Sequence, residues 1–520
     1  MTGGSTNRHI PEFRNISEVV AENAATSEDK PWVIDAETCN SISHGQLHQI
    51  CRRIAAFLRH EGVGVGDTVV VLSQNSIEEA ALHVAVMNYG AVLCPVNTTV
   101  GEKNLEQVLA TLAPRMILWN SGYGHTEELK ALVPGVSLHE YCPWDGSDET
   151  FIVPDSGTVD PTDEVLNVLP SDRAVVIFTS GTTGTPKGVV HTFESYYYLG
   201  CAGIELTSMT REDRILEFRA LTWLSPQGLS LAASLLSGGT LILAKTFSRS
   251  RYFAWVSTHG ATIAVCVPTA LNMLMSEPVD FHASATPQLR YLTSSTAALT
   301  VERQLEFEEL YGIEILTMYG MSESGWMAGN RHGNRRLGTV GFPSATQEMR
   351  LLDEAGNLCA PGEPGEIVTG GLQAAWGYLL GAGEEAPLAD RHAIATGDLG
   401  TFDAEGYLSI VGRRKEIIIR GGVNIAPAEI NEAILKHPAV ADAATVGVDD
   451  PIYGEEVVSF VSLRSEVAAD DLMVHCADLV SEYKLPKEIV ILDSLPYSDR
   501  GKVTAAALKE IWARRSSVDV

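Results

Sequence analysis

Residues 178–188 read FTSGTTGTPKG, a stretch that combines small residues, hydroxyl groups and one lysine. Glycines let backbone N–H groups approach an anion closely, and Ser180, Thr182 and Thr183 add hydroxyl donors. Lys187 adds a positive charge. These residue types fit a loop that holds the phosphates of a nucleotide. A flexible linker is the ordinary alternative, and the spacing excludes a Walker A loop.

Four further polar motifs follow in order along the chain. They are YGMSESG at residues 319–325, TGDLG at 396–400, GRRKEIIIRGGVNIAPAEIN at 412–431 and DRGKV at 499–503. Glu323 in the first motif and Asp398 in the second each add a carboxylate. Each motif alone is also typical of a surface turn, so the argument depends on their combination.

The elements that position these motifs alternate between apolar strands and helical segments. Strands are predicted at residues 68–72, 116–119, 175–178, 241–243, 263–267 and 313–318, and an amphipathic helix at 78–87. This alternation predicts an α/β fold with parallel-type sheets covered by helices. Because Phe178 ends one strand, we expect the loop after it at the carboxyl edge of a sheet, where such folds bind ligands.

The pattern changes toward the C-terminus. From about Leu351 the strands become shorter and turns more frequent, which predicts a small β-rich subdomain. The charged GRRKE segment interrupts two apolar stretches near Gly412. We therefore predict a large N-terminal domain at residues 1–411 and a small α+β domain at 412–520.

Composition narrows the classes of function. The chain has 520 residues, 37 Lys and Arg against 66 Asp and Glu, and a net charge of −29, which disfavours nucleic acid and anionic membranes as partners. An anionic ligand then requires local positive groups. The eight cysteines show no CxxC pair, and the first residues lack the apolar core of a signal peptide. We expect a cytoplasmic protein without a membrane span. The oligomeric state stays open, a homodimer included.

With its five motifs in this order, the sequence resembles the acyl-adenylate-forming superfamily, which includes acyl-CoA synthetases, adenylation domains and firefly-type luciferases. The resemblance implies an ATP-dependent, AMP-forming acid:CoA ligase that uses ATP, Mg²⁺ and coenzyme A. Glu323 would help to hold Mg²⁺, Tyr319 would pack on adenine, and Asp398 would bind the ribose. The residues implied in ATP binding are Thr179, Ser180, Gly181, Thr182, Thr183, Gly184, Lys187, Tyr319, Ser322, Asp398 and Arg413.

The resemblance assigns the C-terminal residues to a reaction in two steps. Lys502 would reach the α-phosphate and the substrate carboxylate during adenylation. The small domain would then rotate about Lys415 and bring Gly421 and Gly422 to the site, where they leave room for the pantetheine arm of coenzyme A. Ser322 stands where the family usually has Thr and keeps the hydroxyl.

The acid is the least determined part of the reaction. Arg219, Trp223, Ser294 and Ser295 are the candidate acyl-pocket residues and favour a small acid with a second polar or anionic group. The alternatives are a structural salt bridge for Arg219 and a core position for Trp223. The segment LEFRALTWLSPQGLS lacks the Asp that amino-acid activation in this family uses. Loading of a carrier protein remains the alternative to coenzyme A, ahead of nucleotide sensing and luciferase-like oxidation.

Overall fold

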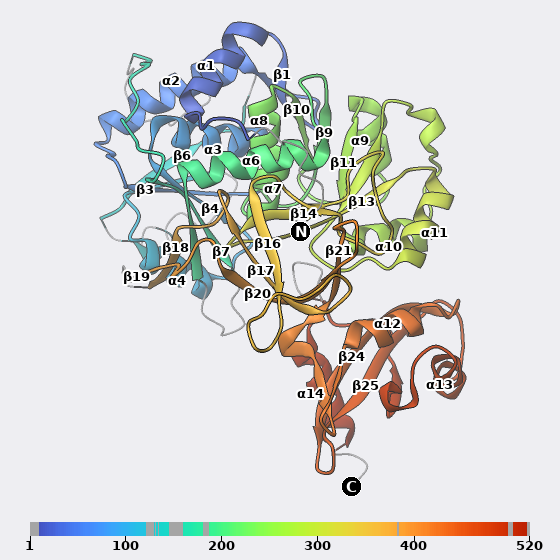
Figure 1. The fold of residues 1–520 in the computed structure, drawn as a ribbon. Helices are drawn as coiled ribbons and strands as arrows, with labels where there is room; N and C mark the ends of the chain where they lie inside the picture. The colour runs from blue at the N-terminus through green and yellow to red at the C-terminus, as the bar shows by residue number, and fades with distance from the viewer. Residues whose placement is uncertain are drawn as a thin grey trace.

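The computed structural model describes residues 10–120, 129, 132, 133, 135–144, 160–179, 187–381, 384–497 and 503–516. Within these ranges the strands form four sheets (Figure 1). Two large sheets and their helices make up most of the chain, and the residues from α12 onward form a separate lobe. The α/β class that the sequence predicts is confirmed.

The larger sheet has a parallel centre and antiparallel edges. Strands β13, β12, β11, β9, β10 and β1 run parallel, while β14 and β15 at one edge and β2 at the other run antiparallel. In spatial order the strands are β15 (Phe342–Pro343), β14 (Gly325–Gly329), β13 (Ile315–Met321), β12 (Tyr291–Ser294), β11 (Ile263–Cys266), β9 (Arg214–Glu217), β10 (Thr240–Leu243), β1 (Pro31–Asp35) and β2 (Ser41–Ser43).

The second sheet is built in the same way. Strands β7, β4, β3, β5 and β6 are parallel, and β8, β18 and β19 extend the sheet antiparallel. In spatial order the strands are β19 (Glu384–Pro387), β18 (Gly377–Gly381), β8 (Lys187–Thr192), β7 (Arg173–Thr179), β4 (Val92–Asn97), β3 (Thr68–Ser73), β5 (Met116–Asn120) and β6 (Ser137–Tyr141).

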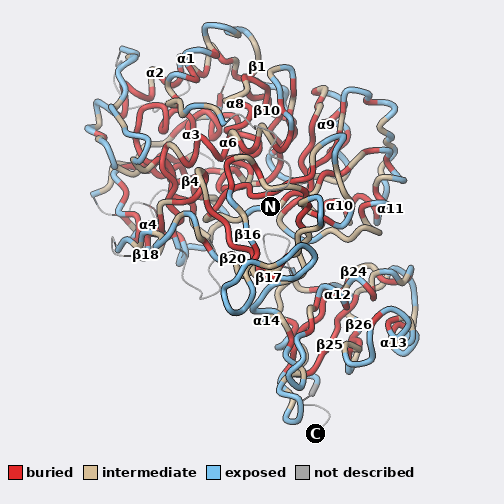
Figure 2. Tube along the Cα trace, in the orientation of Figure 1, coloured by how far each residue is buried: buried red, intermediate tan, exposed pale blue. Residues whose placement is uncertain are grey.

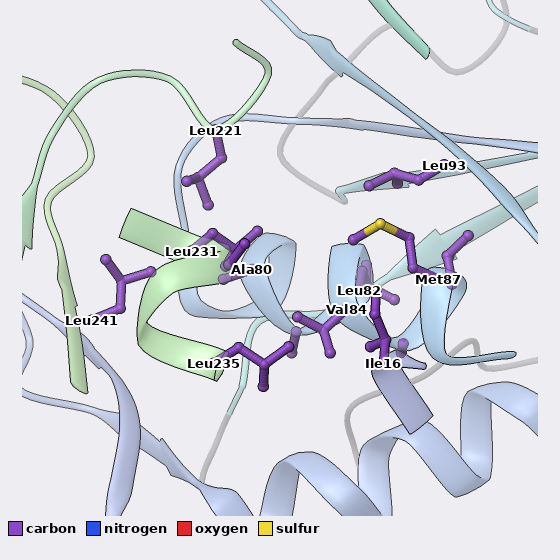
Figure 3. Close-up of a cluster of buried hydrophobic side chains, with 14 of the residues drawn as sticks. Ile16, Ala80, Leu82, Val84, Met87, Leu93, Leu221, Leu231, Leu235 and Leu241 are labelled. Atoms are coloured by element: carbon purple, nitrogen blue, oxygen red, sulfur yellow. The ribbon is translucent and has the colours of Figure 1, made fainter. Parts of the chain in front are cut away.

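Helices cover both sheets and fill the space between them. They are α1 (Ile16–Ser27), α2 (His44–His60), α3 (Ile77–Tyr89), α4 (Glu102–Leu112), α6 (Phe193–Thr207), α7 (Leu224–Pro226), the π-helix η2 (Gln227–Ala232), α8 (Ala233–Ser237), α9 (Tyr252–His259), α10 (Pro268–Ser276), the short 3₁₀-helix η3 (Ala283–Ala285) and α11 (Val301–Tyr311). The largest cluster of buried apolar side chains includes Leu241 of the first sheet and Leu93 of the second, with α3 between them (Figure 3).

Helix α3 corrects one prediction. Residues 78–87 do form a helix, but the expected polar, solvent-facing side does not exist, because every residue of α3 is buried. Its charged residues Glu78, Glu79 and His83 therefore lie inside the protein. Because α3 lies inside the protein (Figure 2), its pattern of polar and apolar residues does not mark a solvent-exposed face.

The C-terminal third forms two smaller sheets. An antiparallel sheet of β16 (Gln347–Leu352), β17 (Gly365–Gly371), β20 (Ile394–Phe402) and β21 (Leu408–Arg413) occupies the region in which the sequence predicts a β-rich subdomain. The last sheet contains β22 (Ile418–Arg420), β23 (Val423–Ile425), β24 (Val440–Asp450), β25 (Gly454–Leu463) and β26 (Glu488–Ile491). It packs with α12 (Pro427–Leu435), α13 (Ala469–Ala477), α14 (Ala505–Ser516) and the 3₁₀-helix η5 (Glu482–Lys484).

The chain passes from one of these sheets to the other through a short segment. Strand β21 ends at Arg413, the 3₁₀-helix η4 spans Arg414–Glu416, and β22 begins at Ile418. The boundary that the sequence suggests between residues 411 and 412 thus falls inside β21, a few residues before the chain changes sheet. The division into residues 1–411 and 412–520 stays a prediction.

Candidate active site

The Gly- and Thr-rich stretch connects two neighbouring strands. Strand β7 ends at Thr179 and β8 begins at Lys187, and these two residues are paired across the antiparallel ladder. The stretch therefore emerges at the carboxyl end of β7, as the sequence predicts. Lys187 is exposed at its base. Ser180, Gly181, Thr182, Thr183 and Gly184 lie outside the described residues.

Glu323 connects the two large sheets. It lies in the turn between β13 and β14 of the first sheet, and its Oε1 accepts a hydrogen bond from the Tyr378 hydroxyl at 3.1 Å. Tyr378 belongs to β18 of the second sheet and is paired with Val189 of β8, two residues after Lys187. Burial and the Glu323 charge both raise the pKa of the Tyr378 phenol, which stays a donor. Glu323 thus lies close to the strand that begins at Lys187.

Ser322 is held to the same strand through its backbone. The imidazole Nε2 of His191, in β8, lies 2.8 Å from the Ser322 carbonyl oxygen. Since a carbonyl only accepts, Nε2 carries the proton. Burial lowers the pKa of His191 to about 4, so the ring is neutral at pH 7. The turn that carries Ser322 and Glu323 is thereby fixed against β8.

Three residues predicted to bind the nucleoside lie in one chain of contacts. The Tyr319 hydroxyl donates to Asp398 Oδ2 at 2.5 Å, and Arg413 Nε lies 2.9 Å from Asp398 Oδ1. Strands β20 and β21 place Asp398 and Arg413 opposite each other. Burial first, and then the Asp398 charge, raise the pKa of the Tyr319 phenol, which remains protonated. The carboxylate of Asp398 is largely buried and is positioned from both sides.

Arg219 forms a buried ion pair, as one of the two interpretations of the sequence predicts. Its Nη2 lies 2.7 Å from Glu217 Oε2, and the two side chains are 1% and 0% exposed. Glu217 also accepts hydrogen bonds from the backbone N–H groups of Phe218 and Arg219 and from the Ser230 hydroxyl of η2. The Glu217 carboxylate thus binds the Arg219 guanidinium together with three further donors. Arg219 is therefore not a free cation.

The other candidate acyl-pocket residues surround this ion pair. Arg219 Nη1 donates to the Ser295 hydroxyl at 3.2 Å, and its guanidinium lies 6.0 Å from the ring centre of Trp326. Ser294 ends β12, its side chain is buried, and its hydroxyl has no hydrogen-bond partner among the described residues. Trp223 is half-buried and precedes α7. Because β9, β12 and β13 are parallel, Arg219, Ser295 and Glu323 follow the same edge of the sheet.

The candidate hinge and the candidate coenzyme A turn lie on elements that follow β21. Lys415 is exposed in η4. Gly421 and Gly422 form the turn between β22 and β23 with φ of 58° and 86°, and the Gly421 N–H donates to the Tyr453 carbonyl of the small domain. Lys502 lies outside the described residues.

Sequence reasoning missed three residues that hold the site. Glu217 had a signal, since an acid two residues before Arg219 at the end of an apolar strand places both charges on one face. Tyr378 and His191 had none, because each acts across strands that are distant in the sequence. Nothing in a local pattern indicates such a pairing.

The described residues lack two features, a metal cluster and a membrane-spanning helix. They contain no cluster of three or more His, Cys, Asp or Glu side chains suited to a metal ion. Likewise, none of the helices within the described ranges has the length and apolar character needed to cross a membrane.

Comparison with known proteins identifies the family. Residues 20–379 match the AMP-binding enzyme family, and residues 429–502 match the AMP-binding enzyme C-terminal domain. The chain is 34% identical to the sulfoacetate–CoA ligase of Cupriavidus necator over 95% of this chain and 98% of that protein. It is 29% identical to the oxalate–CoA ligase of Arabidopsis thaliana over 89% of this chain and 92% of that protein.

A solved structure agrees with these relatives. The o-succinylbenzoate CoA synthetase of Bacillus subtilis, in complex with an acyl-adenylate intermediate, superposes with a TM-score of 0.81 at 26% identity, covering 94% of this chain and 97% of that one. The chain therefore belongs to the AMP-binding enzyme family and, within it, to the ATP-dependent acid:CoA ligases.

Proposed function

We propose that this ligase converts a short carboxylic acid with a second polar group into an acyl-adenylate and then transfers the acyl group to coenzyme A. The observation that carries the proposal is the contact chain Tyr319–Asp398–Arg413, which fixes the Asp398 carboxylate against β13, the strand that precedes Glu323. The named acids of two relatives, sulfoacetate and oxalate, are short and carry a second acidic group.

The nucleotide would be held from two sides. Asp398 offers two oxygens to the ribose hydroxyls, and Arg413 contacts ribose or phosphate after releasing part of its pairing with Asp398. The ring of Tyr319 packs against adenine while its hydroxyl orients Asp398. Thr179 and Lys187 stand at the two ends of the phosphate loop, whose middle residues are Ser180, Gly181, Thr182, Thr183 and Gly184. The lysine and the backbone N–H groups would offset the overall negative charge of the chain.

The residues present fit Mg²⁺. Glu323 Oε1 accepts one hydrogen bond, from Tyr378, which leaves carboxylate lone pairs for a metal. One carboxylate together with substrate phosphates is a usual set of ligands for this ion. The bound ion would neutralise charge as pyrophosphate departs. Ser322 keeps a hydroxyl next to this carboxylate.

The small domain would supply the mobile groups. Lys502 would offer its ammonium group to the α-phosphate and the acid during adenylation, and Lys415, exposed in the segment between the two sheets, would be the hinge. The turn at Gly421 and Gly422 would then admit the thiol arm of coenzyme A. This assignment corresponds to domains at residues 1–411 and 412–520 and to a cytoplasmic enzyme.

The acid pocket would be closed by polar groups that carry no net charge. Arg219, paired with Glu217, donates to the Ser295 hydroxyl, and the hydroxyl of the preceding Ser294 has no hydrogen-bond partner in the part of the chain that the structure describes. Trp223 and Trp326 supply bulk that shortens the pocket. A long unsubstituted chain would have to displace this buried ion pair at a large cost.

A panel of acids in a pyrophosphate-release assay, with and without coenzyme A, tests the proposal. We expect short acids with a second carboxylate, sulfonate or hydroxyl group to be preferred, and acyl-CoA to appear only when coenzyme A is present. A preference for long unsubstituted fatty acids would refute the proposed acid class. Transfer to a carrier protein but not to coenzyme A would favour the alternative acceptor.

A further inference from the structure

Helix α11 belongs to the part of the chain before η4 and contacts the part after it. Its first two turns carry Glu302, Arg303 and Glu306. Arg464, which follows β25, places Nη1 and Nη2 at 2.9 and 3.2 Å from the two carboxylate oxygens of Glu306. Arg303 Nη1 lies 3.0 Å from the same carboxylate. One carboxylate of the large domain thus receives a bidentate arginine from the small domain.

A second set of contacts lies beside this one. Arg303 Nη2 donates to the carbonyl of Ala441 in β24, and Lys436 Nζ lies 4.0 Å from Glu302. The next residue, Asp442, accepts a hydrogen bond from the Tyr497 hydroxyl. The small domain therefore contacts α11 through β24, the strand whose Asp442 binds Tyr497. Tyr497 in turn pairs with Val503.

The position of α11 relates this contact to the active site. The helix begins at Val301, seven residues after β12 ends at Ser294, and Thr300 caps its first turn. The contacting residues Glu302, Arg303 and Glu306 lie in that N-terminal part of the helix. The small domain is consequently held by the first turns of the helix that follows Ser294 and Ser295 in the chain.

The contact is polar and partly open to solvent. The side chains of Arg464 and Glu306 are 38% and 41% exposed. Ion pairs of this kind contribute little individually, and polar interfaces between domains usually permit relative motion. Only one chain segment joins the two units, between Arg413 and Ile418. Small interaction energies at α11 therefore have a direct effect on the orientation of the small domain.

We propose that Arg303, Glu306 and Arg464 are positioning residues that hold the small domain in the orientation used for adenylation. The inference rests on the proposed function, because it assumes the two half-reactions described above. It assigns the adenylating orientation to this arrangement because α11 contacts β24 at Ala441, next to the Asp442 that holds Tyr497, and because α11 is the helix that follows Ser294 and Ser295. Acyl transfer to coenzyme A would require the contact to open.

The variants Glu306→Gln and Arg464→Gln test the inference. Each removes one charge of the ion pair and keeps the size of the side chain approximately. We expect acid-dependent ATP–pyrophosphate exchange to fall about two- to five-fold, whereas acyl transfer from presynthesised acyl-adenylate to coenzyme A is not slowed. The double variant should fall no further than the single ones. Unchanged exchange, or an equal loss in both half-reactions, would overturn the proposal.

A matched control and a structural measurement complete the test. Arg515→Gln breaks an ion pair with Glu488 inside the small domain and should alter neither half-reaction. Amide hydrogen exchange should be faster in residues 301–311 and 436–442 of the Glu306 and Arg464 variants. An unchanged rate of amide hydrogen exchange in these residues would also contradict the proposed role of the α11 contact. If no acid supports pyrophosphate release by the wild-type chain, the proposed function fails, whereas the hydrogen-exchange result still decides whether the contact exists.

Discussion

At the scale of single residues, the carboxylate of Asp398 has the best-defined surroundings in the candidate site. The Tyr319 phenol and the Arg413 guanidinium contact its two oxygens. The backbone N–H of Asp398 donates to the Thr396 hydroxyl at 3.0 Å. Such fixed partners leave the carboxylate little freedom to rotate. An arrangement of this kind suits a carboxylate that must accept two hydroxyl groups in one geometry.

We expect Asp398→Asn to weaken ATP binding. The amide keeps the shape but loses the charge and one acceptor, and hydrogen bonds to charged groups contribute about 1.5–3 kcal/mol. The kcat/KM for ATP should therefore fall roughly ten- to hundred-fold, measured by pyrophosphate release. Tyr319→Phe, which keeps the ring, should cause a smaller loss. If Asp398→Asn lowered the melting temperature without changing the KM for ATP, the carboxylate would be structural only.

The buried acid Glu79 predicts a pH dependence of stability. Burial raises its pKa to about 7, with a smaller contribution from the charge of Glu78. Its neighbours are His83, whose pKa burial lowers to about 3, and the hydroxyls of Ser73 and Tyr141. Since the folded-state pKa lies above the unfolded value of about 4.5, the folded state holds its proton longer. The stabilisation is complete below pH 4.5 and is lost as the pH rises to about 7.

Glu79→Gln removes this titration. Relative to the wild type, the variant should gain stability between pH 4.5 and pH 7, by on the order of 3 kcal/mol. Melting temperatures at a series of pH values measure the difference. Glu348→Gln, at an exposed position of β16, is the control and should follow the wild type. A constant offset between Glu79→Gln and the wild type at all pH values would contradict the assignment.

At the scale of elements, the π-helix η2 shapes the candidate acid pocket. Gln227 donates to the Leu221 carbonyl and accepts from the Tyr196 hydroxyl, and Ser230 donates to Glu217. π-helical turns are rare and frequent at functional sites. Here the turn directs two polar side chains, Gln227 and Ser230, toward the segment that carries Arg219.

Close contact between η2 and α6 depends on glycine. A Cβ at Gly228 would lie 2.4 Å from Leu199 Cγ, and Leu199 is fully buried. We expect Gly228→Ala to destabilise the protein by about 1–3 kcal/mol, measured by thermal denaturation, and to raise the KM for the acid because Gln227 and Ser230 shift. Gly64→Ala, where the nearest atom to the new Cβ is 3.7 Å away, is the control. An unchanged melting temperature would show that α6 and η2 can separate at no cost.

The sequence predicted the strands better than it predicted what surrounds them. Apolar runs located β3, β5, β7, β10 and β11 within two residues at each end, because a buried parallel strand is apolar on both faces. It also placed Thr179 and Glu323 in or beside loops at strand ends. The failures involve contacts distant in sequence. The burial of α3, the π-helix and the Tyr378–Glu323 contact all depend on packing between sheets, which no local periodicity reports.

At the scale of the whole molecule, the residues of the proposed reaction belong to two units joined by one segment. Asp398 and Glu323 precede the η4 segment and Arg413 ends the strand directly before it, whereas Gly421 and Gly422 lie in the sheet that follows it. Groups on separate units meet only in certain orientations, so in the proposed mechanism domain position would control which step proceeds. The net charge of −29 makes this local arrangement more important, since an anionic substrate must be attracted by nearby donors against the overall field.

Lys502→Ala tests this division of labour directly. The ammonium group would stabilise negative charge only while the acid attacks the α-phosphate, and removing one such donor costs about two to three orders of magnitude. We therefore expect acid-dependent ATP–pyrophosphate exchange to fall by that amount. Consumption of presynthesised acyl-adenylate with coenzyme A should continue near the wild-type rate, since in the proposed mechanism that step uses the Gly421–Gly422 turn instead of Lys502. Because the variant keeps this second activity, misfolding cannot explain the loss of the first. Equal losses in both half-reactions would mean that a single domain orientation serves both steps, contrary to the proposed mechanism.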